Sequence, residues 1–137
     1  MRVISVDLGL ARTGIAAGDT AFFLASPVTV INEYNEEKLV DKICQTAKAE
    51  NAEKIVVGLP KNMDGSEGER ALKCREIAQK IAEKSGISIV MQDERCTTVS
   101  AHNALNDNNV RGKKRKGVID PLSAEIILQD ALDRLKR

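Results

Sequence analysis

Aromatic residues are scarce in this chain of 137 residues, which contains two phenylalanines, one tyrosine and no tryptophan. Nucleic-acid-binding modules such as the RRM and OB folds stack bases on exposed aromatic rings. The composition therefore argues against a binding surface of that kind.

Cysteine and histidine are also rare. The three cysteines are far apart and form no Cys-x-x-Cys pair, which argues against a disulfide framework or a zinc site and favours a reducing compartment. The single histidine, His102, could act as a general acid, but a lone histidine more often serves in packing or on the surface.

Long apolar runs are absent as well. No stretch approaches the roughly 18 apolar residues that a membrane-spanning helix needs. The amino-terminal sequence reads as a strand rather than as a signal peptide. We therefore expect a cytoplasmic protein with no membrane partner.

What is present has the composition of an ordinary folded domain, with 42% apolar and 30% charged residues. Such a length suits one domain spanning residues 1–137. The net charge of +1 conceals one basic segment without acids, whose charges are Arg111, Lys113, Lys114, Arg115 and Lys116. Such a run can be a solvated loop, but because this one lies inside the domain we expect salt-sensitive contacts to phosphates, largely independent of base sequence.

The first part of the chain has the pattern of an antiparallel meander. Strands are predicted at residues 3–7, 14–17 and 22–31, joined by short glycine-containing turns. The third strand is expected to be interrupted at Ser26 and Pro27.

After the meander, helices alternate with buried strands. A helix is predicted from Asn35, and a second helix is predicted to open with a capping box between Ser66 and Glu69. The apolar runs at 54–58 and 87–91 are typical of parallel strands covered on both faces.

The last part of the chain is predicted to be helical at residues 97–105 and 120–135, with a loop at 106–117. Asp120 is a natural N-cap before Pro121. The order βββαβαβαα indicates an α/β fold: a mixed five-stranded sheet, made of the antiparallel three-strand meander and two βα strands, with helices on both faces.

One carboxylate interrupts the first apolar strand. Burying Asp7 there is costly unless the carboxylate is paired, hydrogen-bonded or bound to a metal. The first strand is expected to be central, which places Asp7 at the switch point where α/β sheets bind ligands. The alternative is a turn role, in which Asp7 caps the amides of Gly9 and Leu10.

Other acids are expected near the same end of the sheet. Asp93 and Glu94 follow the last predicted strand, and Asp120 opens the last helix. Carboxylates that converge without cysteine or histidine favour Mg²⁺ or Mn²⁺, and two such ions about 4 Å apart can activate water and stabilise the leaving oxygen of a phosphodiester. The alternatives are a salt bridge of Asp93 or Glu94 with Arg95 and a purely capping role for Asp120.

The loop PKNMDGSEG, residues 60–68, is rich in glycine and leads into a helix, so its backbone amides could hold a phosphate. It lacks the Gly-Lys-Ser/Thr of a Walker A motif.

Four segments in order resemble the YqgF/RuvX family, proposed pre-16S rRNA nucleases that are also described as Holliday-junction-resolvase-like proteins. The segments are VDLGLARTGIA, VVGLPKNMDGSEG, DERCTTVSA and KKRKGVID, and the resemblance spans nearly the whole chain. It implies an RNase H-like fold and metal-dependent hydrolysis of phosphodiester bonds, with maturation of the 5′ end of 16S rRNA as the role. It also implies the ligand set Asp7, Glu94 and Asp120, with Asp93 as the alternative to Glu94.

One feature departs from the related junction resolvases, which carry an acid at the end of the strand after the first long helix. Here that strand reads KIVVGLP and has no acid. If the site is catalytic, Glu94 must supply the missing ligand from the neighbouring strand.

We therefore expect a nuclease that acts on structured RNA, with ribosomal precursor RNA as the leading substrate and the basic segment holding the backbone. Further candidates for contacts around the scissile phosphate are Arg12, Thr13, Lys61, Asn62, Arg95 and Thr97.

Other functions stay open. Resolution of branched DNA shares the chemistry but calls for two sites in a fixed homodimer, whereas an RNA nuclease can work as a monomer. A ribosome-assembly factor would keep the fold and cleave nothing, although the presence of all three acids argues against it. Sugar kinases and actin-like ATPases also begin with a strand reading Asp-x-Gly, but they need a second domain for which 137 residues leave no room.

Overall fold

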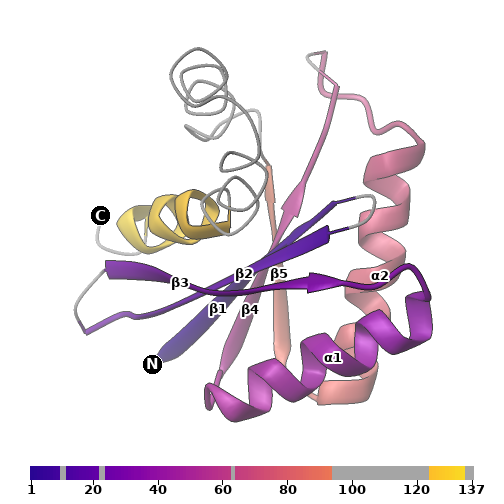
Figure 1. Ribbon diagram of the computed structural model, residues 1–137. Helices are drawn as coiled ribbons and strands as arrows, with labels where there is room; N and C mark the ends of the chain where they lie inside the picture. The colour runs from indigo at the N-terminus through magenta and orange to yellow at the C-terminus, as the bar shows by residue number, and fades with distance from the viewer. Residues whose placement is uncertain (10–11, 22–23, 63, 94–123, 135–137) are drawn as a thin grey trace, which may run out of the picture.

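The chain forms one five-stranded sheet, and each of its last two strands is preceded by a helix (Figure 1). The structure is a computed structural model that describes residues 1–9, 12–21, 24–62, 64–93 and 124–134. In chain order the elements are β1 (Arg2–Leu8), β2 (Arg12–Asp19), β3 (Leu24–Asn32), α1 (Glu36–Ala49), β4 (Lys54–Leu59), α2 (Glu69–Ser85) and β5 (Ser88–Asp93), followed by a C-terminal helix described over residues 124–134.

The strand order is β3-β2-β1-β4-β5, which places β1 at the centre. The pairs β1–β2 and β2–β3 are antiparallel, whereas β4 is parallel to both β1 and β5. The predicted mixed sheet, with its three-strand meander and central first strand, is therefore confirmed.

Each face of the sheet has its own apolar core. Ile4 and Val6 of β1 point to the face covered by α1 and α2, where they pack with side chains such as Ile43. Val3 points to the other face and packs with Ile127 of the C-terminal helix. Figure 1 shows α1 and α2 on one side of the sheet and the C-terminal helix on the other, so the predicted helices on both faces are confirmed.

The ends of the first two helices have identifiable causes. Asn35 caps α1 by accepting a hydrogen bond from the backbone N–H of Lys38, at 3.0 Å. Gly86 ends α2 in the left-handed conformation, with φ at 70°. The predicted capping box at the start of α2 is wrong, because the N-cap is Gly68 and the hydroxyl of Ser66 donates instead to Asp64.

The bounds of all five strands differ from the predicted ones by one or two residues, and β3 and β5 each show a further difference. The third strand is continuous through Pro27, because β3 is an edge strand with a bulge opposite Ile15 and Ala16, and edges and bulges are where sheets tolerate proline. Asp93 is the last residue of β5 rather than the residue after the strand. Parallel pairing continues that far, with Leu59 opposite Asp93.

The predicted helix at 97–105, the loop at 106–117 and the cap at Asp120 lie outside the residues that the structure describes. Among the helices it does describe, none is long and apolar enough to span a membrane.

Candidate functional site

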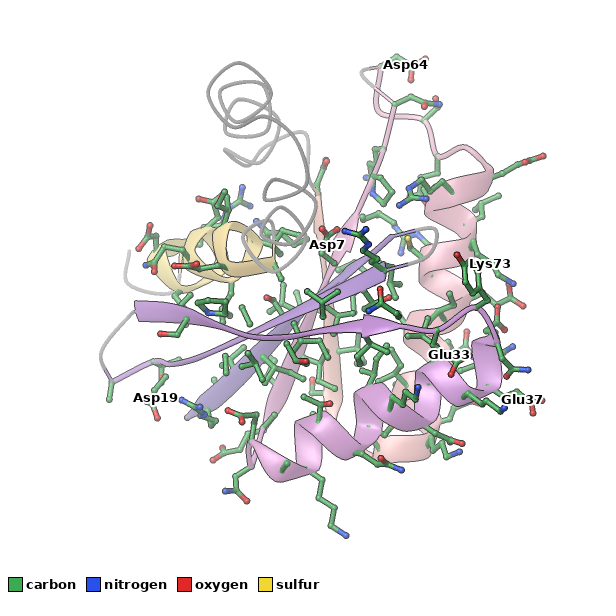
Figure 2. All side chains as sticks on the ribbon, in the orientation of Figure 1. Asp7, Asp19, Glu33, Glu37, Asp64 and Lys73 are labelled. Carbon is green, nitrogen blue, oxygen red and sulfur yellow. The ribbon has the colours of Figure 1, made fainter. Side chains whose placement is uncertain are left out.

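Asp7 lies near the carboxyl end of the central strand and faces the C-terminal helix. Successive side chains of a strand point to opposite faces. Ile4 and Val6 belong to the core under α1 and α2, while Ser5 donates a hydrogen bond to the carbonyl of Ala124, at 2.5 Å. Asp7 therefore shares the face of Ser5, and its side chain is half-buried. Figure 2 labels Asp7 near the middle of the molecule, with Asp64 far away at the tip of the loop after β4.

Glycines flank Asp7 on both neighbouring strands. Gly14 of β2 is its antiparallel partner. Val6 pairs with Val57 of β4, so the next step of the same register sets Asp7 beside Gly58. No side chain from either neighbouring strand therefore stands next to the carboxylate on its face of the sheet.

The C-terminal helix starts over β1 and continues toward β3. Its residue Ala124 meets Ser5, whereas Gln129 accepts a hydrogen bond from the backbone N–H of Ala25, at 3.0 Å, close to the starting end of β1. The amino-terminal end of the described helix is therefore the end nearer to Asp7. Asp120 precedes Ala124 by four residues and lies outside the described part of the chain.

The structure does not bring Asp93 together with Asp7. Ile89 and Met91 pack against the core under α1 and α2, and Asp93 continues this alternation on the same face. There it lies near Glu67, whose pKa is held below its ordinary value by the Arg75 guanidinium, while the charge of Asp93 opposes that shift. Asp7 and Asp93 thus point to opposite faces of the sheet.

The turn that follows Asp7 requires a glycine at position 9. The backbone N–H of Gly9 donates to the carbonyl of Arg12, at 2.8 Å, which closes the hairpin between β1 and β2. A Cβ on Gly9 would lie 2.2 Å from that carbonyl oxygen, so only glycine fits. The donor of Gly9 is thus engaged in the turn, which weakens the alternative that Asp7 serves to cap this amide.

The two candidates on β2 point in opposite directions. Arg12 alternates with Gly14 and therefore shares the face of Asp7. Thr13 lies on the face of α1 and α2, opposite Leu8, and its side chain is buried. Thr13 therefore does not reach the surface that Asp7 faces.

The loop between β4 and α2 is held together by its own hydrogen bonds. The backbone N–H groups of Asn62, Gly65 and Ser66 donate to acceptors within the loop. The Asn62 side chain donates to the Ser66 hydroxyl, and Lys61 lies 4.0 Å from Glu67. Because these amides are already bonded, the geometry does not favour the expected phosphate cradle in this loop.

Asp7 is the one predicted metal ligand that the structure describes, since Glu94 and Asp120 lie outside its range. Within the described residues, no group of three or more histidine, cysteine, aspartate or glutamate side chains could hold a metal ion. A carboxylate flanked by two glycines has the hard oxygen donor and the lateral space that Mg²⁺ or Mn²⁺ requires. Asp7 therefore fits one ligand of such a site. The remaining predicted contacts also lie outside the described range, and they are Arg95, Thr97, Arg111, Lys113, Lys114, Arg115 and Lys116.

Gln92 is a residue of this face that the sequence analysis did not single out. It pairs with Gly58 and is buried, although it lies on an edge strand. The signal available in the sequence was a polar residue at the end of an apolar strand. Its alignment with Asp7 became visible only with the strand register.

Comparison with known proteins gives consistent matches over the whole chain. The model of a family described as RuvX, Holliday junction resolvase, matches residues 1–134. A protein of Bacillus cereus (strain B4264) named "Putative pre-16S rRNA nuclease" is 40% identical over 98% of this chain and 99% of its own length. A protein of Leuconostoc mesenteroides with the same name is 41% identical over 97% of this chain and 95% of its own.

Among solved structures, RuvC of T. thermophilus in complex with a Holliday junction substrate superposes with a TM-score of 0.62 at 12% sequence identity. The match covers 99% of this chain and 96% of that chain. At this identity the likeness concerns the fold, and it confirms the expected RNase H-like architecture.

Proposed function

This chain belongs to the RuvX family, and we propose that it is a metal-dependent endonuclease that cleaves structured RNA, with the precursor of 16S rRNA as its substrate. Family membership confirms the resemblance stated from the four sequence segments and, with it, the enzyme class of a nuclease. The proposal concerns the substrate, the metal and the residues that act. The observation that carries it is the half-buried Asp7 at the end of the central strand, with a glycine on either side.

The proposed metal ligands are Asp7, Glu94 and Asp120. Gln92 points to the face of Asp7, whereas Asp93 points to the other face of the sheet. This favours Glu94 over Asp93 as the second ligand. The direction of the C-terminal helix favours Asp120 as the third, because the chain enters that helix from the side of Asp7.

A divalent cation bound by these carboxylates would supply an activated water and neutralise charge at the leaving oxygen. The chain itself would position the substrate. Arg12 is on the face of Asp7 and can pair with a phosphate oxygen, and the basic segment that contains Arg111 can hold the backbone on either side. The glycines beside Asp7 allow the scissile phosphate to approach the carboxylate closely.

Pre-16S rRNA is the substrate in the name of the B. cereus relative, and we place the chain in ribosome biogenesis in the cytoplasm on that ground. Resolution of branched DNA is the second candidate function, and the family description and the junction bound to T. thermophilus RuvC favour it. The two functions differ in assembly, because a symmetric junction is cut by two sites in a fixed dimer and a precursor RNA can be cut by a monomer.

The deciding experiment is a cleavage assay with Mg²⁺ or Mn²⁺ on three substrates: a precursor RNA spanning the 5′ end of 16S rRNA, an unstructured single-stranded RNA and a four-way DNA junction. We expect cleavage of the precursor alone. Cleavage of the junction alone, by a protein that is dimeric in solution, would replace the RNA proposal with the resolvase function. Cleavage of none of the three, by a chain that still binds the precursor, would favour a non-cleaving assembly factor.

A further inference from the structure

The backbone carbonyl of Leu8, the residue that follows Asp7, points away from β2. The backbone N–H of Gly9 donates to the carbonyl of Arg12, and in an antiparallel ladder this makes Leu8 and Thr13 a pair that exchanges no hydrogen bonds. The N–H and C=O groups of Leu8 are therefore directed toward β4, the strand on the other side of β1.

The backbone of β4 cannot continue the ladder to this carbonyl. The pairing of β1 with β4 ends at Val6 and Val57. If the same register were extended by two residues, the donor to Leu8 would be the residue after Leu59, because a carbonyl in a parallel ladder accepts from the residue one beyond its opposite partner. That residue is Pro60, which has no N–H group.

Arg70 of α2 supplies the donor instead. Its Nη2 donates to the carbonyl of Leu8 at 2.8 Å in a partly buried contact, and Figure 1 shows the end of β1 beside α2. Arg70 is the second residue of α2, in a first turn where the helix dipole disfavours a positive charge. Helix stability therefore does not explain an arginine at this position, whereas its bond to β1 does.

The surroundings of Arg70 support this assignment. The groove in which it lies is lined by Leu8 and by carboxylates that include Glu33 and Glu36. The ion pairs of these two acids are with lysines, and the guanidinium of Arg70 is bonded to the strand. Arg70 approaches β1 from the face covered by α1 and α2, opposite to the face of Asp7.

We propose that Arg70 is a positioning residue for the nuclease site. By holding the carbonyl of Leu8, it fixes the strand end that carries Asp7 and the hairpin that carries Arg12, on the side where pairing with β4 stops. It acts through the backbone and does not contact the substrate. The inference rests on the proposed function, since the groups that it positions are those proposed to hold the cation and the phosphate.

The test compares Arg70→Met with the wild-type chain. Methionine keeps an apolar stem and removes the donors. In a Mg²⁺ cleavage assay on precursor RNA that spans the 5′ end of 16S rRNA, we expect kcat to fall about tenfold, because small displacements of reacting groups are costly, while KM stays level. In calorimetry with Mn²⁺ alone, the Kd for the ion should rise about tenfold, as for the loss of a group that orients a metal ligand.

Two further measurements separate positioning from substrate contact. The Kd for labelled precursor RNA, measured by fluorescence anisotropy in EDTA, should be unchanged in Arg70→Met. Amide hydrogen exchange of Gly9, measured by NMR, should become about tenfold faster, because the strand end has lost an anchor. Arg70→Lys keeps the charge and one donor and should recover part of kcat.

The matched control is Arg2→Met at the opposite end of β1. The Arg2 side chain also donates to a backbone carbonyl, that of Glu50, and to the carboxylate of the same residue. Arg2→Met should lower the Tm at least as much as Arg70→Met does, and it should leave kcat, the Kd for Mn²⁺ and the exchange of Gly9 at their wild-type values.

Two results would overturn the inference. Wild-type kcat and Mn²⁺ affinity in Arg70→Met would leave Arg70 with a structural role only, whatever its Tm. A raised KM and a raised Kd for RNA, with kcat unchanged, would make Arg70 a substrate contact. If Arg70→Met does not fold, Arg70→Gln, which is shorter by two bonds, takes its place and is judged by the same values.

Failure of this inference can be told apart from failure of the proposed function. A wild-type chain that cleaves no substrate contradicts the nuclease, yet the exchange of Gly9 still decides whether Arg70 holds the end of β1. A wild-type chain that cleaves precursor RNA, together with an Arg70→Met variant of equal kcat and Mn²⁺ affinity, contradicts only the role of Arg70.

Discussion

The two faces of the central sheet are formed by the same strands but differ in the residues they carry. On the face covered by α1 and α2, β1 contributes Ile4 and Val6 to the larger apolar core. On the opposite face, β1 contributes Val3, Ser5 and Asp7, of which only Val3 belongs to an apolar core. One strand thus places apolar residues on one side and increasingly polar ones on the other.

The second face also changes along its length. Near the start of β1 it is apolar, where Val3 and Val56 pack under the C-terminal helix. At the other end this face carries two glycines, a carboxylate and a carboxamide, which bury little apolar surface: Gly14, Gly58, Asp7 and Gln92. We infer that the first face supplies most of the stability and that the far end of the second face carries the chemistry. Substitutions on the first face should therefore mainly change stability, and substitutions at the far end of the second face should mainly change the cleavage rate.

The largest effect is expected for Asp7→Asn. This change removes the charge of a proposed metal ligand while keeping the shape of the side chain. Cleavage of precursor RNA should slow about a thousandfold or more, which corresponds to about 4 kcal/mol of transition-state stabilisation. Binding of Mn²⁺, measured by calorimetry, should weaken in parallel. The Tm should stay level or rise, because active-site charges are commonly held at a cost in stability.

The control for Asp7→Asn is Asp133→Asn, the same change at an exposed residue of the C-terminal helix, which should leave rate and Mn²⁺ affinity unaltered. If Asp7→Asn unfolded the chain as readily as a core substitution does, the proposed division of labour between the two faces would be wrong. Activity that persists in Asp7→Asn would remove this residue from the mechanism.

The opposite result is expected for Ile43→Ala, on the face of α1 and α2. Ile43 is fully buried in the larger core. Its truncation should lower the free energy of unfolding by about 2–4 kcal/mol, from lost apolar burial and the cavity left behind. Urea unfolding measures this loss. Ile43→Val should cost only about 1 kcal/mol. The cleavage rate per folded molecule should remain that of the wild type, and a loss of rate in the folded fraction would show that the faces are coupled.

An intermediate effect on the rate is expected for Gly58→Ala. The new Cβ would stand beside Asp7 on its face of the sheet, where the substrate phosphate is proposed to lie. Cleavage should slow about tenfold or more, since small displacements of reacting groups are costly. The matched control is Gly68→Ala, whose Cβ would meet the Asn62 side chain at an ordinary 3.7 Å. Equal rates for the two variants would mean that the space beside Asp7 is not used by the substrate.

The sequence was most informative where one physical rule applies to one short segment. Alternation and turns predicted the meander and the central strand with Asp7, and helical spacing predicted a helix from Asn35, the residue that caps α1 in the structure. Prediction failed where two local partners compete. Ser66 has the spacing of a capping box, yet its hydroxyl bonds to Asp64 two residues earlier.

Features that depend on strand register could not be read from the sequence. The alignment of Gln92 with Asp7 requires both the pairing of β1 with β4 and that of β4 with β5. The separation of Asp93 from Asp7 depends on which residue of β5 faces which core, and a shift of one residue would exchange the two faces. The face to which each residue of β5 points is fixed by the packing of the whole sheet.

The smallest effect is expected for Glu36, which joins the two helices of the first face. Its carboxylate forms ion pairs with Lys73 and Lys80 of α2, and the hydrogen bond from Lys73, followed by that from Lys80, holds the pKa of Glu36 below its ordinary value of 4.5. The lowered pKa in the folded state means that these pairs stabilise the fold at neutral pH, and that this stability is lost as the pH falls from about 4.5 through the folded pKa.

Glu36→Gln should therefore lower the free energy of unfolding by about 1 kcal/mol or less at pH 7, because the lysines are well exposed and water screens the pairs. The difference from the wild type should shrink toward zero at pH 3 and also in 1 M salt. Glu37→Gln, the neighbouring exposed acid in the first turn of α1, is the control and should show a smaller difference at pH 7. The cleavage rate should be unchanged at every pH where the variant is folded. If the difference in free energy of unfolding persists at pH 3, Glu36 stabilises the helix pair by packing rather than by charge.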